Sequence, residues 1–412
     1  MKWFCVFFFL HIFIFTCTAQ QFNLTGMVKD RRHGEALPGA GIYVSGYKMA
    51  TVSNPEGKFT MRLNPGNYDI LVQLIGYKSL RKNVIIADQS INTTFTLEES
   101  VTQLAEVTIK PDPNREYYLN IFKDFFIGTT PNAKKCKLIN PNVLMIDYEK
   151  EHSRLTVKTN QFLIIENKAL GYQIKYLLNL FQFDYKSNII YYEGFPYYDD
   201  LKGSSRQKRN WEKKRLIAYR GSPQHFFKSL YQKKAATEGF TINKLILGSN
   251  PDKPSDSMIQ ANIRRLSEKS IHSGTIDLNK DDSLNYWIRK KNLPAEIAIL
   301  NRAAVVEDTL VRKVNANIRK INFTDKLFIS YTREKEDLSF SNAIGMSLSR
   351  PPDMKNHQAS SITLQVSPVY FYENGGIYNP RSVLFSGYWA WEKIADSVPM
   401  DYMPLNGDNS TR

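Results

Sequence analysis

Cysteine is almost absent from this sequence. Its 412 residues include three cysteines, and Cys5 and Cys17 lie in a hydrophobic N-terminal segment. Without that segment Cys136 stands alone, and one thiol can form neither an internal disulfide nor a multi-cysteine zinc site. Stability must therefore come from packed cores, which a chain of this length can bury. Nearby lysines would favour the Cys136 thiolate, but no histidine or aspartate is arranged beside it, so we expect a buried or half-buried structural cysteine.

Histidines with metal-binding spacing are missing as well. Zinc carboxypeptidases use His-x-x-Glu with a distant histidine, and other metallopeptidases use His-Glu-x-x-His. Glutamate stands at none of the positions three residues after His33, His152, His225, His272 and His357. A Gly-x-Ser-x-Gly elbow and a phosphate-binding loop are also absent from the sequence. We therefore expect a protein that is not an enzyme, with no catalytic residues, no bound metal and no cofactor.

One enzymatic alternative stays open, an envelope hydrolase of peptidase or glycosidase type with an active site assembled from scattered residues. The carboxylate pairs Asp199-Asp200 and Asp281-Asp282 lie in polar, turn-like sequence, where solvated charge is the ordinary explanation. A glycosidase needs two carboxylates facing each other across a cleft, which sequence spacing does not reveal.

Long hydrophobic runs are confined to the N-terminus. A positively charged start is followed by an apolar run over residues 3–15 and by small residues up to Ala19, the order of a cleaved secretory signal peptide. The run is too short for the roughly 20 residues of a membrane-spanning helix. We predict that residues 1–19 are removed, that the protein reaches the periplasm or outer membrane, and that the mature chain has no transmembrane helix. The alternative is a lipoprotein that is acylated at Cys17, but the bulky side chain of Phe15 fits a lipoprotein signal poorly.

Residues 24–77 alternate in the manner of short β-strands. Between Tyr68 and Leu74 every second residue is apolar, the period of a half-buried strand. The same alternation recurs over 40–44 and 59–63. The runs are separated by turn-forming Leu37-Pro38-Gly39, Asn54-Pro55-Glu56-Gly57 and Asn64-Pro65-Gly66-Asn67. Short strands with such regular turns predict an antiparallel β-sandwich.

The order of these strands and turns, from Phe22 to Leu97, resembles the carboxypeptidase-like regulatory domain, a transthyretin-like (prealbumin-like) module. The resemblance implies a sandwich that is not itself catalytic. In large outer-membrane receptors the same module precedes a plug and barrel, and this chain has too few residues for that architecture. Other stretches resemble uncharacterised exported bacterial proteins in which the module precedes a β-rich body; they comprise residues 136, 140–141, 166–172, 218–227 and 387–394.

A domain boundary is expected at Pro111, where Pro and Asn interrupt the pattern. Residues 20–110 would form the sandwich and residues 111–412 a larger β-rich α+β domain. Aromatic residues at helical spacing predict a core-facing helix that ends at Gly128. A second helix should start at Ser222, an N-cap followed by proline. Alternating runs predict strands at 144–148, 155–157, 172–180, 189–194, 327–332, 362–366, 369–372 and 382–385.

The sharpest local feature is a basic run between residues 202 and 220, in which eight lysines and arginines stand against Glu212 alone. In a cytosolic protein such a run suggests nucleic acid, but export argues against that partner. An anionic membrane, a polysaccharide or an acidic envelope protein are the remaining partners, and a solvated face with its tryptophan packed inward is the structural explanation. The candidate binding residues are Arg206, Lys208, Arg209, Trp211, Lys213, Lys214 and Arg215.

These patterns predict an exported, non-catalytic protein of a Gram-negative cell envelope with a binding or assembly role. Its fold should be mostly β, with the N-terminal sandwich followed by the larger domain.

Overall fold

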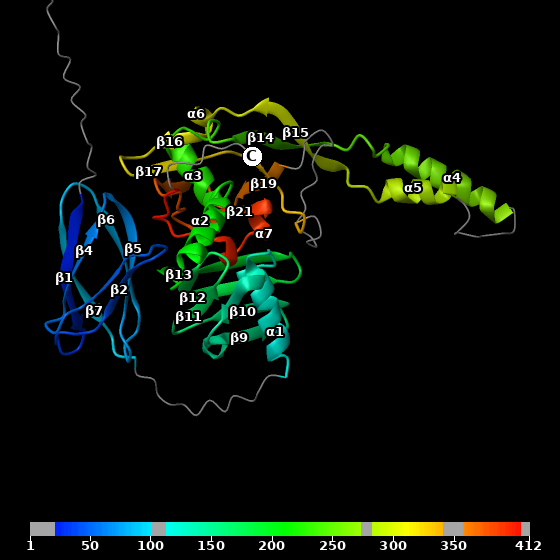
Figure 1. Cartoon of the computed structure of the whole chain (residues 1–412). Coiled ribbons are helices and arrows are strands. Elements are labelled where there is room, and N and C mark those ends of the chain that lie inside the picture. Colours follow the sequence, from blue (N-terminus) through cyan, green and yellow to red (C-terminus); the bar gives the residue numbers. More distant parts are fainter. Residues whose placement is uncertain (1–20, 101–112, 273–281, 341–356, 405–412) are drawn as a thin grey trace, which may run out of the picture. The chain divides into compact units, whose positions relative to one another are not determined.

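The computed structural model describes residues 21–100, 113–272, 282–340 and 357–404. The expected signal peptide and the boundary at Pro111 lie outside these residues. The chain divides into two compact units, one that joins the N-terminal residues to Phe195–Asp199 and one, which we call the body, that contains the rest from Pro113 onward. The predicted fold class is confirmed, because both units are built mostly from β-sheets (Figure 1).

The described strands of the N-terminal unit form two sheets, ordered β4-β1-β7 and β3-β2-β5-β6. Strand β1 pairs antiparallel with β4 and parallel with β7. As the alternation predicts, Ile42, Phe59 and Ile70 point into one buried apolar core. The strands are β1 (Phe22–Asp30), β2 (Gly41–Val44), β3 (Ala50–Val52), β4 (Lys58–Leu63), β5 (Gly66–Gln73), β6 (Leu80–Ile86) and β7 (Ile91–Leu97).

We expect residues 20–110, expressed alone, to fold, because the two sheets enclose a contiguous core of their own and domains of about 100 residues can be independently stable. The fragment should give a β-type circular dichroism spectrum and a cooperative thermal transition. A disordered fragment would show that this core needs the rest of the chain.

The body begins with α1 (Arg115–Phe122), which continues directly into a π-helical turn, η1 (Lys123–Ile127). Phe122 and Phe126 are fully buried and pack against Phe181 and Tyr176 with ring centroids 5.1 and 5.0 Å apart. The prediction of a core-facing aromatic helix up to Gly128 is confirmed, with a final turn that is π rather than α. Such turns are rare and occur often at functional sites.

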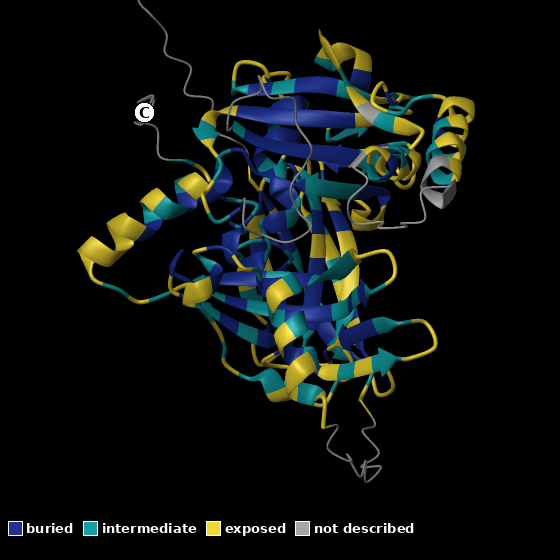
Figure 2. Ribbon diagram, turned by 90° about the vertical axis from the view of Figure 1, so that its right-hand side faces the viewer, coloured by how far each residue is buried: buried dark blue, intermediate teal, exposed yellow. Residues whose placement is uncertain are grey.

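This helical segment packs against the first sheet of the body. The sheet has the strand order β8-β11-β12-β10-β9, and β13 pairs with β12. In Figure 2 many strand residues are buried or intermediate, and exposed residues are frequent on helices and turns. The elements are η2 (Ala133–Lys135), β8 (Cys136–Leu138), η3 (Pro141–Val143), β9 (Met145–Glu149), β10 (Arg154–Lys158), β11 (Leu163–Asn167), β12 (Tyr172–Asp184) and β13 (Ile189–Asp200).

Two helices follow, α2 (Ser205–Tyr219) and α3 (Pro223–Tyr231). The prediction for the start of α3 is confirmed, because the Ser222 hydroxyl accepts the His225 backbone N–H at 3.1 Å. Phe226 and Phe227 on α3 join a second buried core. Helix α2 lies within the basic run and was not predicted as a helix.

The second sheet of the body has the order β15-β14-β18-β19-β21, and a smaller sheet has the order β16-β17-β20. Helices α4 and α5, which lie against each other, connect β14 to β15 (Figure 1). The elements are β14 (Phe240–Ser249), α4 (Asp256–His272), α5 (Asp282–Lys291), β15 (Glu296–Ala304), α6 (Glu307–Leu310), β16 (Val311–Lys313), β17 (Ile318–Ile321), β18 (Lys326–Lys335), β19 (His357–Leu364), β20 (Val369–Tyr372), η4 (Pro380–Ser382), β21 (Val383–Gly387), α7 (Tyr388–Trp391) and η5 (Ile394–Asp396).

Candidate anion-binding surface

Helix α2 gives the basic run a rigid support. Ser204 and Gln207 form a reciprocal capping box, in which the Ser204 hydroxyl accepts the Gln207 N–H and the Gln207 side chain accepts the Ser204 N–H at 2.8 Å. This arrangement satisfies donors that a helix start otherwise leaves unpaired. The helix then holds its side chains in fixed directions over about 22 Å, at 1.5 Å per residue.

Two of the predicted binding residues lie on the inner face of α2, so the prediction is wrong for Trp211 and Arg215. Trp211 is 7% exposed and donates its indole N–H to the Lys168 carbonyl at 3.1 Å. Gly171, with φ of +72°, lies beneath this ring, and a Cβ there would come within 2.1 Å of it. These contacts fix the helix to the turn between β11 and β12.

Arg215 completes the attachment of α2. Its guanidinium donates to the carbonyls of Leu170 and Gly171 at 2.7 and 3.0 Å and to Asp200 at 2.7 Å. It also stacks over the Tyr172 ring, with 3.9 Å from Cζ to the centroid. The basic run in the sequence does not distinguish Arg215 from its exposed neighbours, because only the folded structure shows that its side chain points inward.

The remaining predicted residues do form an exposed basic face. Arg206, Arg209 and Lys213 recur at three- and four-residue spacing and therefore share one side of the helix. Lys208 is exposed beside them, and Lys214 is half-buried. In the part of the chain that the structure describes, none of these five has an acidic partner within ion-pair distance. We call Arg206, Arg209 and Lys213 the α2 face.

The structure adds a second basic segment, which no sequence pattern connects to the first. Exposed Lys134, Lys135 and Lys137 lie on η2 and β8. The Lys168 N–H donates to the Lys135 carbonyl at 3.2 Å, so the same loop that holds Trp211 also holds η2. Burial, with the facing Lys135 ammonium, lowers the pKa of Lys214. Facing ammonium groups of this kind favour an anion between them.

The buried carboxyl group of Asp396 holds the start of η2 in place. Asp396 accepts hydrogen bonds from the Thr130 hydroxyl at 2.9 Å and from the Asn132 amide at 2.9 Å. Nearby, the Asn167 amide donates to the Ala395 carbonyl at 2.9 Å. Burial raises the pKa of Asp396 to about 6. The stretches around 136, 166–172 and 387–394, which sequence resemblance singled out separately, thus meet around this segment.

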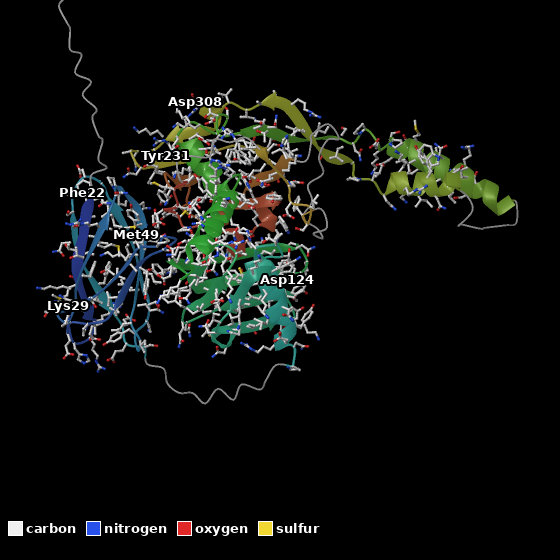
Figure 3. The ribbon with its side chains drawn as sticks, viewed as in Figure 1. Phe22, Lys29, Met49, Asp124, Tyr231 and Asp308 are labelled. Carbon is white, nitrogen blue, oxygen red and sulfur yellow. The ribbon has the colours of Figure 1, made fainter. Side chains whose placement is uncertain are left out.

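An open cavity of about 570 Å³ lies between η1 and the η2–β8 segment. Its lining includes Asp124, Lys134, Cys136 and Lys137, and Figure 3 labels Asp124 on the helical segment that follows α1. Cys136 is half-buried, and burial raises its pKa to about 12. Burial therefore outweighs the nearby lysines, and Cys136 is half-buried, as expected.

Another cavity, of about 520 Å³, lies between the end of α3, β14 and α6. Lys233 in its lining pairs with Asp308 at 2.7 Å. Glu307 accepts the Ala236 N–H at 3.0 Å through one oxygen, and its other oxygen is buried without a hydrogen-bond partner among the described residues. Apolar residues of β14 and of the segment before α6 form much of the remaining wall. This cavity therefore offers an incoming anion less than the first cavity does.

Other ionisable groups are buried in the body. The His225 Nδ1 accepts the Gly221 N–H at 3.2 Å, and burial lowers the pKa of this histidine to about 3, so it is neutral. Burial raises the pKa of Glu334 to about 7 and that of Glu392 well above its ordinary value. Among the described residues, no group of three or more His, Cys, Asp or Glu side chains is arranged to hold a metal ion.

Comparisons with known proteins identify one part of the chain. Residues 24–109 match the family described as the CarboxypepD_reg-like domain, which confirms the resemblance of the N-terminal sandwich. The comparison with curated proteins gives no match.

Similar solved structures include hydroxyquinol 1,2-dioxygenase from Pseudomonas putida, with 13% identity over 21% of this chain and 58% of that chain and a TM-score of 0.18. The group B streptococcus pilus 2b backbone protein has 16% identity over 19% of this chain and 41% of that chain, with a TM-score of 0.17. The shaft pilin SpaA from Lactobacillus rhamnosus has 14% identity over 20% of this chain and 48% of that chain, with a TM-score of 0.17. The chain thus spans less than two thirds of each of these proteins.

Proposed function

We propose that the protein is an exported, non-catalytic binding protein of the cell envelope whose body holds a linear acidic polysaccharide on the α2 face. The observation that carries the proposal is the row of exposed cations on one side of a firmly anchored helix, for which the described residues offer no acidic partner. A rigid row of charges matches a polymer with anionic groups at regular intervals. Neutralising several such groups together releases their counterions, as in other polyanion complexes.

The chemistry of the face favours a polysaccharide over the other two partners. Membrane-surface helices bury an apolar and aromatic side in the lipid, whereas α2 turns Trp211 and Tyr219 into the protein. Protein interfaces have an aromatic or aliphatic centre, and on α2 the one large exposed apolar residue is Ile217, at the far end. A surface made of charge alone fits a hydrated polyanion best.

Export is supported by the signal-like N-terminal sequence and by the CarboxypepD_reg-like domain, which is typical of extracytoplasmic proteins. No helix in the described parts of the chain has both the length and the apolar character to cross a bilayer.

The hydrolase alternative would draw on Glu334 and Glu392, because raised pKa values suit general acids. Networks with a purely structural role shift carboxyl pKa values in the same way, so these values alone do not indicate catalysis.

The test is equilibrium binding of the mature chain to a linear polyuronate, with neutral dextran as the control polymer. The Arg206→Gln/Arg209→Gln/Lys213→Gln variant should bind about 100-fold more weakly, since three charges at about 1 kcal/mol each amount to roughly two factors of ten. The matched variant Lys150→Gln/Lys313→Gln/Lys326→Gln, which removes three exposed lysines elsewhere on the body, should bind like wild type.

Two results would contradict the proposal. Binding to phosphatidylglycerol vesicles without binding to the polyuronate would make the face a membrane contact. A shortened polymer after prolonged incubation would make the protein a hydrolase.

A further inference from the structure

We infer that the cavity between η1 and the η2–β8 segment is a subsite for one sugar-acid unit, a hexuronate with its ring hydroxyls. The inference rests on the proposed function for the polymer to which that unit belongs. The α2 face would then supply attraction along the chain, and the cavity would supply recognition of a single unit.

The cavity has the size for such a unit. Its volume of about 570 Å³ lies within the range of about 300–1,000 Å³ of small-molecule sites, ample for a monosaccharide and far larger than an inorganic anion needs. Lys134, which is exposed, forms part of its lining. Lys135, next in sequence, faces Lys214 of α2, so the segment that lines the cavity lies beside that helix.

The cations of the cavity are available to a ligand. Neither Lys134 nor Lys137 has an ion pair within the described residues. Lys137 lies opposite Glu166 in the strand register, but that carboxylate already pairs with Lys168 at 3.1 Å. Lys123, the third lysine of the lining, is occupied by the Asn120 side chain at 3.4 Å and by Glu116 at 3.9 Å. The ligand's carboxylate would therefore meet two ammonium groups.

Asp124 sets the chemical class of the ligand. Its carboxyl lines the cavity that Lys134 and Lys137 share, and an ionised carboxylate only accepts hydrogen bonds. Inorganic phosphate or a sulfate group would bring further negative charge toward it. A hexuronate instead offers one carboxylate for the lysines and several hydroxyl donors for Asp124. The pairing of cations with an acceptor thus fits an acidic sugar.

The backbone explains why Asp124 is available. The π-helical turn η1 buries Phe126 and Ile127 and leaves Asp124 on the exposed side. Gly128, with φ of +109°, then turns the chain toward η2, and a Cβ there would come within 3.2 Å of the Lys393 side chain. The cavity is therefore bounded by two segments whose positions are set by packing.

The test is calorimetric titration of the mature chain with galacturonate, and separately with galactose and inorganic phosphate. Wild type should bind galacturonate at least tenfold more tightly than either control ligand. Lys134→Gln/Lys137→Gln should weaken galacturonate binding at least tenfold, and Lys313→Gln/Lys326→Gln, the matched loss of two exposed lysines, should not. Asp124→Asn should weaken galacturonate binding and strengthen phosphate binding, because it removes the repelling charge.

The subsite is overturned if galacturonate fails to bind, if it binds the Lys134→Gln/Lys137→Gln variant like wild type, or if phosphate binds as tightly. The Arg206→Gln/Arg209→Gln/Lys213→Gln variant separates the two proposals. It should bind galacturonate normally and the polyuronate weakly. Normal binding of both ligands would leave the subsite standing and refute the α2 face.

Discussion

Replacement of Arg215 by glutamine should destabilise the body by about 3 kcal/mol, whereas the same replacement of Arg209 should change its stability by less than about 0.5 kcal/mol. Arg215 donates to two backbone carbonyls and to Asp200 from a buried position. Glutamine is too short to reach all three, so the Leu170 carbonyl and Asp200 would lose this donor, whereas the Gly171 carbonyl keeps the Leu201 N–H at 2.9 Å. Arg209 is exposed on the same helix, and its removal leaves no buried group unpaired.

The measurement is urea unfolding followed by tryptophan fluorescence. After the predicted cleavage site the tryptophans stand at positions 211, 287, 389 and 391, all in the body, so the signal reports that unit without the N-terminal sandwich. Binding to the polyuronate should show the reverse order at pH 7, with Arg209→Gln weakened although it is stable. Equal stability of the two variants would contradict the anchoring role of Arg215.

Replacement of Asp396 by alanine should cost the body roughly 2–6 kcal/mol at pH 5. Two donors, the Thr130 hydroxyl and the Asn132 amide, would lose their acceptor, at about 1–3 kcal/mol for each buried unsatisfied group. The same urea titration measures the effect. Asparagine at this position keeps an acceptor in place and should cost much less.

Asp396 should also make stability depend on pH. Its folded-state pKa of about 6 lies above the ordinary 3.8, so the folded body binds this proton more tightly than the unfolded chain does. The contribution of the group to stability is therefore most favourable below pH 4, and roughly 3 kcal/mol of it is lost as the pH rises through about 6.

The Asp396→Asn variant isolates this effect, because it retains every other titrating group, including His225. Relative to wild type, the variant should gain roughly 3 kcal/mol in unfolding free energy between pH 4 and pH 7. Parallel profiles for the two proteins would show that Asp396 titrates as it does in water.

The N-terminal sandwich was predictable because its signals are local. The alternation around Ile42, Phe59 and Ile70 places these residues in the core, and the turns carry residues that suit them, such as Gly57 with φ of +70°. The parallel pairing of β1 with β7 is different, because it joins segments far apart in the chain and has no local sequence signature.

Much of the body was not predictable for the same physical reason. Helix α2 carries charge on most sides, and its inner face includes Arg215. It therefore lacks the apolar stripe from which a helix is predicted. The basic segment on η2 is held in place by contacts such as that between Thr130 and Asp396, which are 266 residues apart. The lysines at 134 and 137 therefore became candidate binding residues only when the fold was known.

Hydrogen–deuterium exchange of the mature chain with and without the polyuronate shows directly where the polymer binds. We expect slower amide exchange in α2 (Ser205–Tyr219) and in the segment from Lys123 to Leu138, with the exchange of β1 to β7 unchanged. Protection confined to the N-terminal sandwich, or spread evenly over the chain, would contradict this expectation.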